Sequence, residues 1–185
     1  MNDPAPPRPA VVSLELLLDP GLESHIRAEW QALKEAGLSS LGAHEAPSNR
    51  PHITLVVRPS IPPVSPVDLG AVVTLPVPVT LGGLVLFGSG DRRVLARSVV
   101  PTEELLTLHA ALHALAGGEG DNAPHTRPGE WAPHITLARR LRLDALPQAL
   151  RMLDDVGLPP TGTSATTLRR WDAASATVTT LLGQP

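Results

Sequence analysis

The sequence predicts an α+β domain with two largely antiparallel sheets, and three observations lead to that class. The chain has 185 residues, 42% of them apolar and 18% charged, which fits one globular domain. Strand-like and helix-like segments follow one another without the strict alternation of a parallel sheet. One pentapeptide occurs twice, once in each half of the chain, so we expect the two halves to be related by an approximate two-fold axis.

The first half of the chain begins with a strand and a helix. Val11–Leu18 is an apolar, β-branched run typical of a buried strand, and Asp19-Pro20 supplies a helix cap followed by a proline at the first helical position. Gly37 is placed to end this helix. The apolar face of the helix consists of Leu22, Ile26, Trp30 and Leu33. The segments expected next are a loop over 38–50, a strand over 52–57 and a proline-dense connector over 59–66.

The rest of the chain contains six further strands and two helices by the same criteria. Gly88–Asp91 separates two strand-like runs and predicts a hairpin. Glu103 and Glu104 lie in the first turn of a helix, where the helix dipole favours acids. The expected strands are 72–80, 81–87, 93–100, 134–138, 165–171 and 176–182, the first of them leading out of the connector, and the expected helices are 102–115 and 144–156. In the last helix, Leu146, Leu150 and Leu153 are expected to face the core.

Composition excludes several classes of function. The chain has no cysteine, which removes disulfide scaffolds, zinc-cysteine sites and cysteine nucleophiles. Three Trp, one Phe, no Tyr and a net charge of −3 argue against a broad platform for long nucleic acid. Residues 1–10 are Pro-rich and polar, which predicts a flexible N-terminal arm, and no apolar run is long enough to span a membrane. We therefore expect residues 11–185 to form one cytoplasmic, monomeric domain that does not bind membranes.

The repeated pentapeptide, Pro-His-Ile-Thr-Leu, lies at 51–55 and again at 133–137. Each copy is predicted to be a strand, in which successive side chains alternate between the two faces. The Ile and Leu can therefore pack in a core while the His and Thr lie together on the opposite face. If the two strands meet across a cleft, two imidazoles and two hydroxyls converge. These side chains are His52, Thr54, His134 and Thr136.

This set of groups is suited to phosphate chemistry. A neutral His can take a proton from a nucleophile while a protonated His gives one to a leaving oxygen, and Thr hydroxyls can donate to phosphate oxygens. The residues alone do not say which His has which role. One alternative is that each His is a structural core residue. Another is a metal site, although neither copy has a carboxylate or second His at ligand spacing. Two copies in identical context favour paired catalysis without a cofactor.

A resemblance to a known family is carried by the second copy and its flanks, Trp131-Ala132-Pro133-His134-Ile135-Thr136-Leu137-Ala138-Arg139. This segment resembles the His-x-Thr-Leu-Ala-Arg signature of the two-histidine (2H) phosphoesterase superfamily. Within that superfamily, the chain resembles the bacterial 2′-5′ RNA ligase and RNA 2′,3′-cyclic phosphodiesterase family, whose two His-x-Thr or His-x-Ser motifs lie about this far apart. The resemblance extends roughly over residues 11–182.

The resemblance implies a bilobal α+β fold, in which a pseudo-two-fold arrangement of two sheets with helices packed outside leaves a central cleft. It also implies metal-independent opening of a 2′,3′-cyclic phosphate, on an RNA 3′ end or a small nucleotide, to a 2′-phosphate, together with reversible 2′-5′ RNA ligation. It assigns His52 as the acid and His134 as the base. Thr54 and Thr136 would hold the phosphate, and Arg139 would add charge to it. Because Arg139 has an odd offset from His134, the strand must twist, bulge or end before it. The alternative for Arg139 is a solvated surface side chain.

Other histidines are weaker candidates. His109 and His113 lie four residues apart on a predicted helix, a spacing that could bind a metal, but both flank its leucine stripe and are expected to have structural or surface roles. His25 and His44 are isolated and are expected at the surface. Trp131 and Trp171 are expected in the core rather than stacked on a base.

Two other functions stay open at this stage. One is a module that binds phosphate termini without turnover, which the intact histidines of both motifs disfavour. The other is a related enzyme that acts on 2′-5′ oligonucleotides or small cyclic nucleotides, which the scarcity of aromatic and basic side chains favours.

Overall fold

The protein was examined as a computed structural model that describes residues 11–117 and 125–184. The predicted arm, residues 1–10, lies outside the described residues, as does part of the polar loop expected before Gly129. None of the helices in the described ranges has the length and apolar character needed to cross a membrane.

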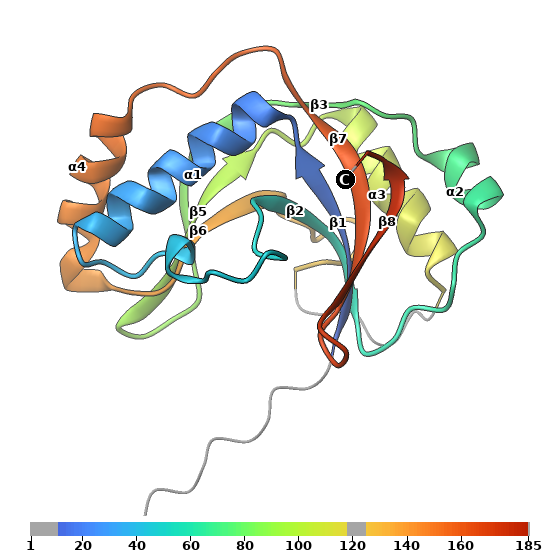
Figure 1. Ribbon diagram of the computed structural model, residues 1–185, viewed down its shortest axis with the longest axis horizontal. Coiled ribbons are helices and arrows are strands. Elements are labelled where there is room, and N and C mark those ends of the chain that lie inside the picture. Colours follow the sequence, from blue (N-terminus) through green and yellow to red (C-terminus); the bar gives the residue numbers. More distant parts are fainter. Residues whose placement is uncertain (1–10, 118–124, 185) are drawn as a thin grey trace, which may run out of the picture.

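Two antiparallel sheets form the centre of the fold (Figure 1), which confirms the predicted α+β class. The first has the order β2-β1-β7-β3, with β8 also paired to β7. Its strands are β1 (Val12–Leu18), β2 (His52–Arg58), β3 (Val77–Val79), β7 (Thr163–Asp172) and β8 (Thr177–Gly183). The second sheet has the order β4-β5-β6, with strands β4 (Leu81–Phe87), β5 (Arg92–Val99) and β6 (His134–Arg142).

Four α-helices and two short 3-10 turns cover the sheets in pairs. Helices α1 and α4 pack together on one side of the molecule, and α2 and α3 on the other (Figure 1). The helices are α1 (Pro20–Glu35), α2 (Pro66–Val72), α3 (Glu103–Leu115) and α4 (Leu146–Val156), and the 3-10 turns are Leu41–Ala43 and Leu143–Ala145. Helix α1 contacts β1 and β7 of the first sheet and also β6 of the second, whereas α3, which follows β5 of the second sheet, contacts β2 and β3 of the first. Both helices therefore help to hold the two sheets together.

Local signals explain where several elements begin. Asp19 caps α1 by accepting a hydrogen bond from the Leu22 amide at 2.9 Å, as the Asp-Pro pair predicts. Ser65 and Pro66 give α2 the same start, because the Ser65 hydroxyl accepts from the Val67 amide at 3.2 Å. This helix lies where we expected a connector and the start of a strand. The strand expected over 72–80 is reduced to Val77–Val79.

The core is largely the predicted one. The apolar stripe of α1 is buried, and Trp30 is 2% exposed. In α4, however, Leu153 and Ala149 are buried while Leu150 is 43% exposed, so the expected inward position of Leu150 is wrong. At 100° per residue, Leu150 lies at the edge of the face that is centred on Ala149 and Leu153, and it therefore reaches solvent.

Candidate active site

The two copies of the pentapeptide lie on the strands where the sheets meet. Strand β2 is the edge of the first sheet and β6 is the edge of the second, and the two strands contact each other at the centre of the molecule (Figure 1). In both copies the Ile and Leu are buried, whereas the His and Thr are partly exposed. The predicted division between a core face and a polar face is therefore present in both strands.

Each of these strands has a β-bulge at the same place. Glu15 pairs with Thr54 while Leu14 pairs with Val56, which leaves one extra residue in β2. In β6, the bulge falls at the corresponding position, because Ala96 pairs with Thr136 and Leu95 with Ala138.

The bulges change which residues share the polar face. Two consecutive residues are buried at each bulge, and the burial pattern then brings Val57 in β2 and Arg139 in β6 back toward the face of His and Thr. This is the bulge that a phosphate-binding Arg139 requires. Its side chain is exposed, so a ligand can reach it.

Both motif histidines are oriented by the same backbone contact. The Nδ1 atom of His52 lies 2.7 Å from the Arg50 carbonyl oxygen, and that of His134 lies 2.7 Å from the Ala132 carbonyl oxygen. A carbonyl oxygen only accepts, so each Nδ1 carries the proton and donates it. The Nε2 atom of each ring is then the one that can gain or lose a proton.

The backbone of each motif is held by a tryptophan. The Trp30 indole, on α1, donates to the Thr136 carbonyl at 3.0 Å, and the Trp131 indole donates to the Thr54 carbonyl at 3.2 Å. Each indole comes from the other half of the chain. Within the residues that the structure describes, the hydroxyls of Thr54 and Thr136 bond no other protein group, and both residues are partly exposed. These hydroxyls can therefore donate to a ligand.

A buried ion pair lies beside His52. Glu15 is 4% exposed, and its Oε1 atom is 3.7 Å from His52 Nε2. Arg169 holds the other oxygen at 2.7 Å, and the Ser13 hydroxyl donates to Oε1 at 2.6 Å. Burial by itself raises the pKa of the Glu15 carboxyl, but the charges of His52 and Arg169 and the hydrogen bonds outweigh burial, so this pKa lies below its usual value.

The surroundings of His134 are apolar by comparison. The Phe87 ring packs against the His134 imidazole with ring centroids 4.5 Å apart. Burial lowers the pKa of His134, the Ala132 carbonyl raises it, and the charge of His52 lowers it further, with a net decrease. That effect of His52 also places the two imidazoles within electrostatic range of each other.

The rings of Trp131, His109 and His113 stack on one another next to strand β2. His109 lies parallel to Trp131, with centroids 4.0 Å apart, and His113 packs on His109. The His113 Nε2 atom is 3.1 Å from the Leu55 carbonyl oxygen. His109 and His113 are 1% and 6% exposed, which confirms their expected structural role. In the described ranges, no group of three or more His, Cys, Asp or Glu side chains is placed to hold a metal ion.

Two other histidines and two tryptophans have expected positions from the sequence. His44 is exposed, as expected, but His25 is partly buried with its Nε2 atom 3.7 Å from Glu29, so its expected surface position is wrong. Trp131 and Trp171 are half-buried. Trp131 is thus a structural side chain, consistent with its expected place against the core.

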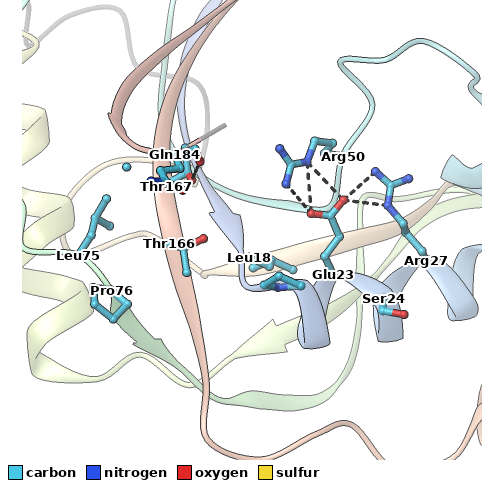
Figure 2. A pocket seen from close by; sticks show the side chains of 12 residues that line it. Leu18, Glu23, Ser24, Arg27, Arg50, Leu75, Pro76, Thr166, Thr167 and Gln184 are labelled. Atoms are coloured by element: carbon cyan, nitrogen blue, oxygen red, sulfur yellow. Dashed lines mark hydrogen bonds and ion pairs between the residues drawn. The ribbon is translucent and has the colours of Figure 1, made fainter.

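Two pockets flank the first motif and share Arg50. One, of about 760 Å³, lies beside α1, and Figure 2 shows the Glu23 carboxylate there between Arg50 and Arg27. Glu23 accepts from Arg50 Nη2 at 2.7 Å, which fixes the residue whose carbonyl orients His52. The other pocket, of about 510 Å³, lies between Pro47 and Val178 and includes Arg169.

Sequence reasoning missed Glu15, Arg169 and Arg50. Glu15 could have been found, because an acid inside an apolar strand must have a partner. Its partner, Arg169, is 154 residues away in sequence, and only the β1–β7 pairing brings the two together.

The paired His and Thr side chains, on two edge strands with matching bulges, define a site of the two-histidine phosphoesterase type. A family model described as the 2′-5′ RNA ligase superfamily matches residues 22–181. The chain therefore belongs to the 2′-5′ RNA ligase superfamily, and it is an enzyme of the two-histidine phosphoesterase kind.

Two solved structures are similar to this chain at 13% sequence identity and a TM-score of 0.47. They are Kluyveromyces marxianus Usb1 and the same protein with uridine monophosphate. The first covers 92% of this chain and 97% of its own, and the second covers 94% and 98%. No curated protein matches the sequence.

Proposed function

We propose that this protein is a monomeric, cytoplasmic, metal-independent phosphodiesterase that opens 2′,3′-cyclic phosphates, on RNA 3′ ends or small nucleotides, to 2′-phosphates. The observation that carries the proposal is the matched pair of histidines, each with Nδ1 bonded to a carbonyl two residues earlier and Nε2 left for chemistry. Membership of the superfamily supports the same class of reaction.

The proposed reaction needs one proton acceptor and one proton donor. His134 Nε2 takes a proton from water, whose oxygen attacks phosphorus. The bond from phosphorus to the 3′ oxygen breaks, and His52 Nε2 gives its proton to that oxygen. The 2′ ester bond is kept, so the product has a 2′-phosphate. If an RNA 5′ hydroxyl replaces water as the nucleophile, the same step forms a bond from phosphorus to the 5′ oxygen, breaks the bond to the 3′ oxygen and gives a 2′-5′ linkage.

The phosphate itself would be held by neutral and charged donors on the same face. The Thr54 and Thr136 hydroxyls would donate to the non-bridging oxygens, and the Arg139 guanidinium would balance their charge.

The test is turnover of an oligonucleotide that ends in a 2′,3′-cyclic phosphate, with chelator present and the product end identified. We expect a 2′-phosphate and a loss of about 10²- to 10⁴-fold in kcat for His52→Ala and for His134→Ala. His44→Ala is the matched control, since His44 is exposed and lies outside the site.

Each outcome of that test has a meaning. Turnover that persists in both histidine variants would overturn the mechanism. Binding of the cyclic phosphate without turnover of this substrate, a 2′-5′ dinucleotide or a small cyclic nucleotide would identify a binding module instead.

A further inference from the structure

The two halves of the active site differ at one structurally equivalent position. Glu15 pairs directly with Thr54 across β1 and β2, and Ala96 pairs directly with Thr136 across β5 and β6. Both positions come just before the matching bulge, so they are equivalent in register. The residue opposite the motif Thr is therefore a carboxylate beside His52 and a methyl group beside His134.

We propose that Glu15 is a positioning residue that keeps His52 in its protonated form and thereby sets His52 as the acid and His134 as the base. This inference rests on the proposed function for its catalytic consequence. Its physical content, a difference in protonation between the two histidines, does not depend on any substrate.

One oxygen of the Glu15 carboxylate, Oε1, lies next to the His52 imidazole. Arg169 binds Oε2 through Nη2 at 2.7 Å and Nε at 2.8 Å, which leaves Oε1 on the side of His52. The Ser13 hydroxyl donates to Oε1 at 2.6 Å, and Arg169 is itself fixed by the Ser48 carbonyl at 3.0 Å. The carboxylate therefore has one orientation, with Oε1 3.7 Å from His52 Nε2.

Both nitrogens of the His52 ring consequently face acceptors. Nδ1 donates to the Arg50 carbonyl, and Nε2 lies near a carboxylate, an arrangement that only the doubly protonated ring satisfies on both sides. Before substrate arrives, Glu15 balances the charge of the imidazolium. When the leaving oxygen takes the proton, the neutral ring remains.

Other charged groups also lie near His52. Arg169, on β7, is bonded to the far oxygen of Glu15. The Arg50 guanidinium is paired with Glu23, 2.7 Å away. His134, on β6, is within electrostatic range, because the charge of His52 lowers the pKa of His134. The two imidazoles therefore repel when both are charged, and the Glu15 carboxylate lies beside only one of them.

A second buried carboxylate, Glu29 of α1, contacts strand β5 of the second sheet, but it does not lie opposite the motif Thr. Glu29 pairs with Arg97, and Arg97 is directly opposite the buried Ile135, not the motif Thr. Glu29 is 0% exposed and, like Glu15, is bound to an arginine. It therefore supplies a matched control: a buried carboxylate in an arginine pair that does not face either motif histidine.

The experiment measures histidine protonation and activity separately. NMR titration of the imidazole protons, assigned with His52→Ala and His134→Ala, compares the two rings in the unmodified protein. We expect His52 to lose its proton at higher pH than His134. In Glu15→Gln, we expect that pH for His52 to fall by about one unit, with Glu29→Gln unchanged and Glu15→Asp partly restored.

The pH dependence of kcat/KM should shift in the same direction as the titration of His52. A protonated acid is lost as pH rises, so the descending limb of the kcat/KM profile should move to lower pH by about one unit in Glu15→Gln. A merely structural role would lower activity at all pH values without moving the limb.

The outcomes separate the two proposals. Shifted His52 titration without any turnover of cyclic phosphates would overturn the proposed function and keep the role of Glu15. Turnover with an unshifted limb and unshifted His52 titration in Glu15→Gln would overturn the role of Glu15. If that variant does not fold, the order of the two titrations in the unmodified protein decides, and a lower value for His52 overturns the inference.

Discussion

The segments β1–α1–β2 and β5–α3–β6 have the same backbone plan but different charges. In both, two antiparallel strands flank a helix, the second strand has Pro-His-Ile-Thr-Leu, and a bulge follows the Thr. In both, the histidine Nδ1 donates to a carbonyl two residues earlier, and the Thr carbonyl accepts from a Trp indole. The scaffold that aims the side chains is thus duplicated.

The differences lie in the residues around each motif. Glu15 lies opposite the Thr of the first motif and Ala96 lies opposite the Thr of the second, while Val57 and Arg139 each follow the motif Thr by three residues. A buried carboxylate therefore lies beside His52, and an exposed guanidinium follows the second motif along its strand. Duplication thus supplies the backbone geometry of both motifs, whereas the residues around the two motifs differ in charge.

Among the residues that differ between the two halves, the largest effect on activity is expected for Arg139. Arg139→Ala should lower kcat/KM for a cyclic phosphate by about 10- to 100-fold, the value of one charge-assisted hydrogen bond. Steady-state kinetics measure this loss, which should fall as salt rises, since salt screens exposed charges. The control is Arg142→Ala, because Arg142 is exposed on the same strand and paired with Asp144.

Equal losses in the two arginine variants would contradict the role of the bulge. A complementary variant, Val57→Arg, places the same charge at the equivalent position of the first motif. It should not restore the activity of Arg139→Ala if the two sides of the phosphate have different requirements. Full restoration would show that the two halves are interchangeable in binding.

The sequence predicted the parts of the fold that depend on local pattern. The strand over 81–87 has the predicted bounds, and the cap at Asp19 begins α1 as expected. Helix α2 was missed because its prolines favoured a connector, although Ser65-Pro66 is the same kind of start as Asp19-Pro20. The motif face was predictable because a period of two is a local property of a strand.

Long-range pairing accounts for what the sequence could not predict. The bulge that re-aims Arg139 depends on where β5 pairs with β6, and the Arg169 partner of Glu15 lies at the other end of the chain. The indole bonds to the motif carbonyls join residues 106 and 77 positions apart. None of these partners has a local signal, because the same side chains would suit a core or a surface equally well.

A smaller effect is expected where the halves are alike, at the two tryptophans. Trp30→Phe and Trp131→Phe each remove one indole donor from a motif carbonyl. Trp30 is 2% exposed, so its loss leaves the Thr136 carbonyl without its partner inside the core and should lower the free energy of unfolding by about 1–3 kcal/mol. Trp131 is half-buried, and water can replace its bond, so about 1 kcal/mol or less is expected.

Urea unfolding of both variants measures this difference. Phe87→Leu serves as an aromatic control, because the Phe87 ring contacts His134 and donates no hydrogen bond to either motif carbonyl. A larger loss for Trp131→Phe than for Trp30→Phe would mean that the stack with His109, rather than burial of the indole bond, holds the first motif.

The smallest effect is a loss of stability in mild acid. It is expected from His109, in the second half of the chain. Burial, aided by the neighbouring His113, lowers the pKa of His109 from 6.5 to about 4, although hydrogen bonds to backbone carbonyls raise it. Between these values the unfolded chain binds a proton that the folded chain does not, so stability is complete above pH 6.5 and falls as pH falls toward 4.

Urea unfolding at pH 7 and pH 5 should show a decrease of about 1 kcal/mol, allowing for partial screening. His109→Gln should reduce this decrease, and His44→Gln, at an exposed site, should not. The lowered pKa values of Glu15 and Glu23 act in a different window, because carboxylates lose their stabilising charge only as pH falls below the usual 4.5. A decrease that survives His109→Gln would assign the acid sensitivity to His113 or His134, whose pKa values are also lowered by burial.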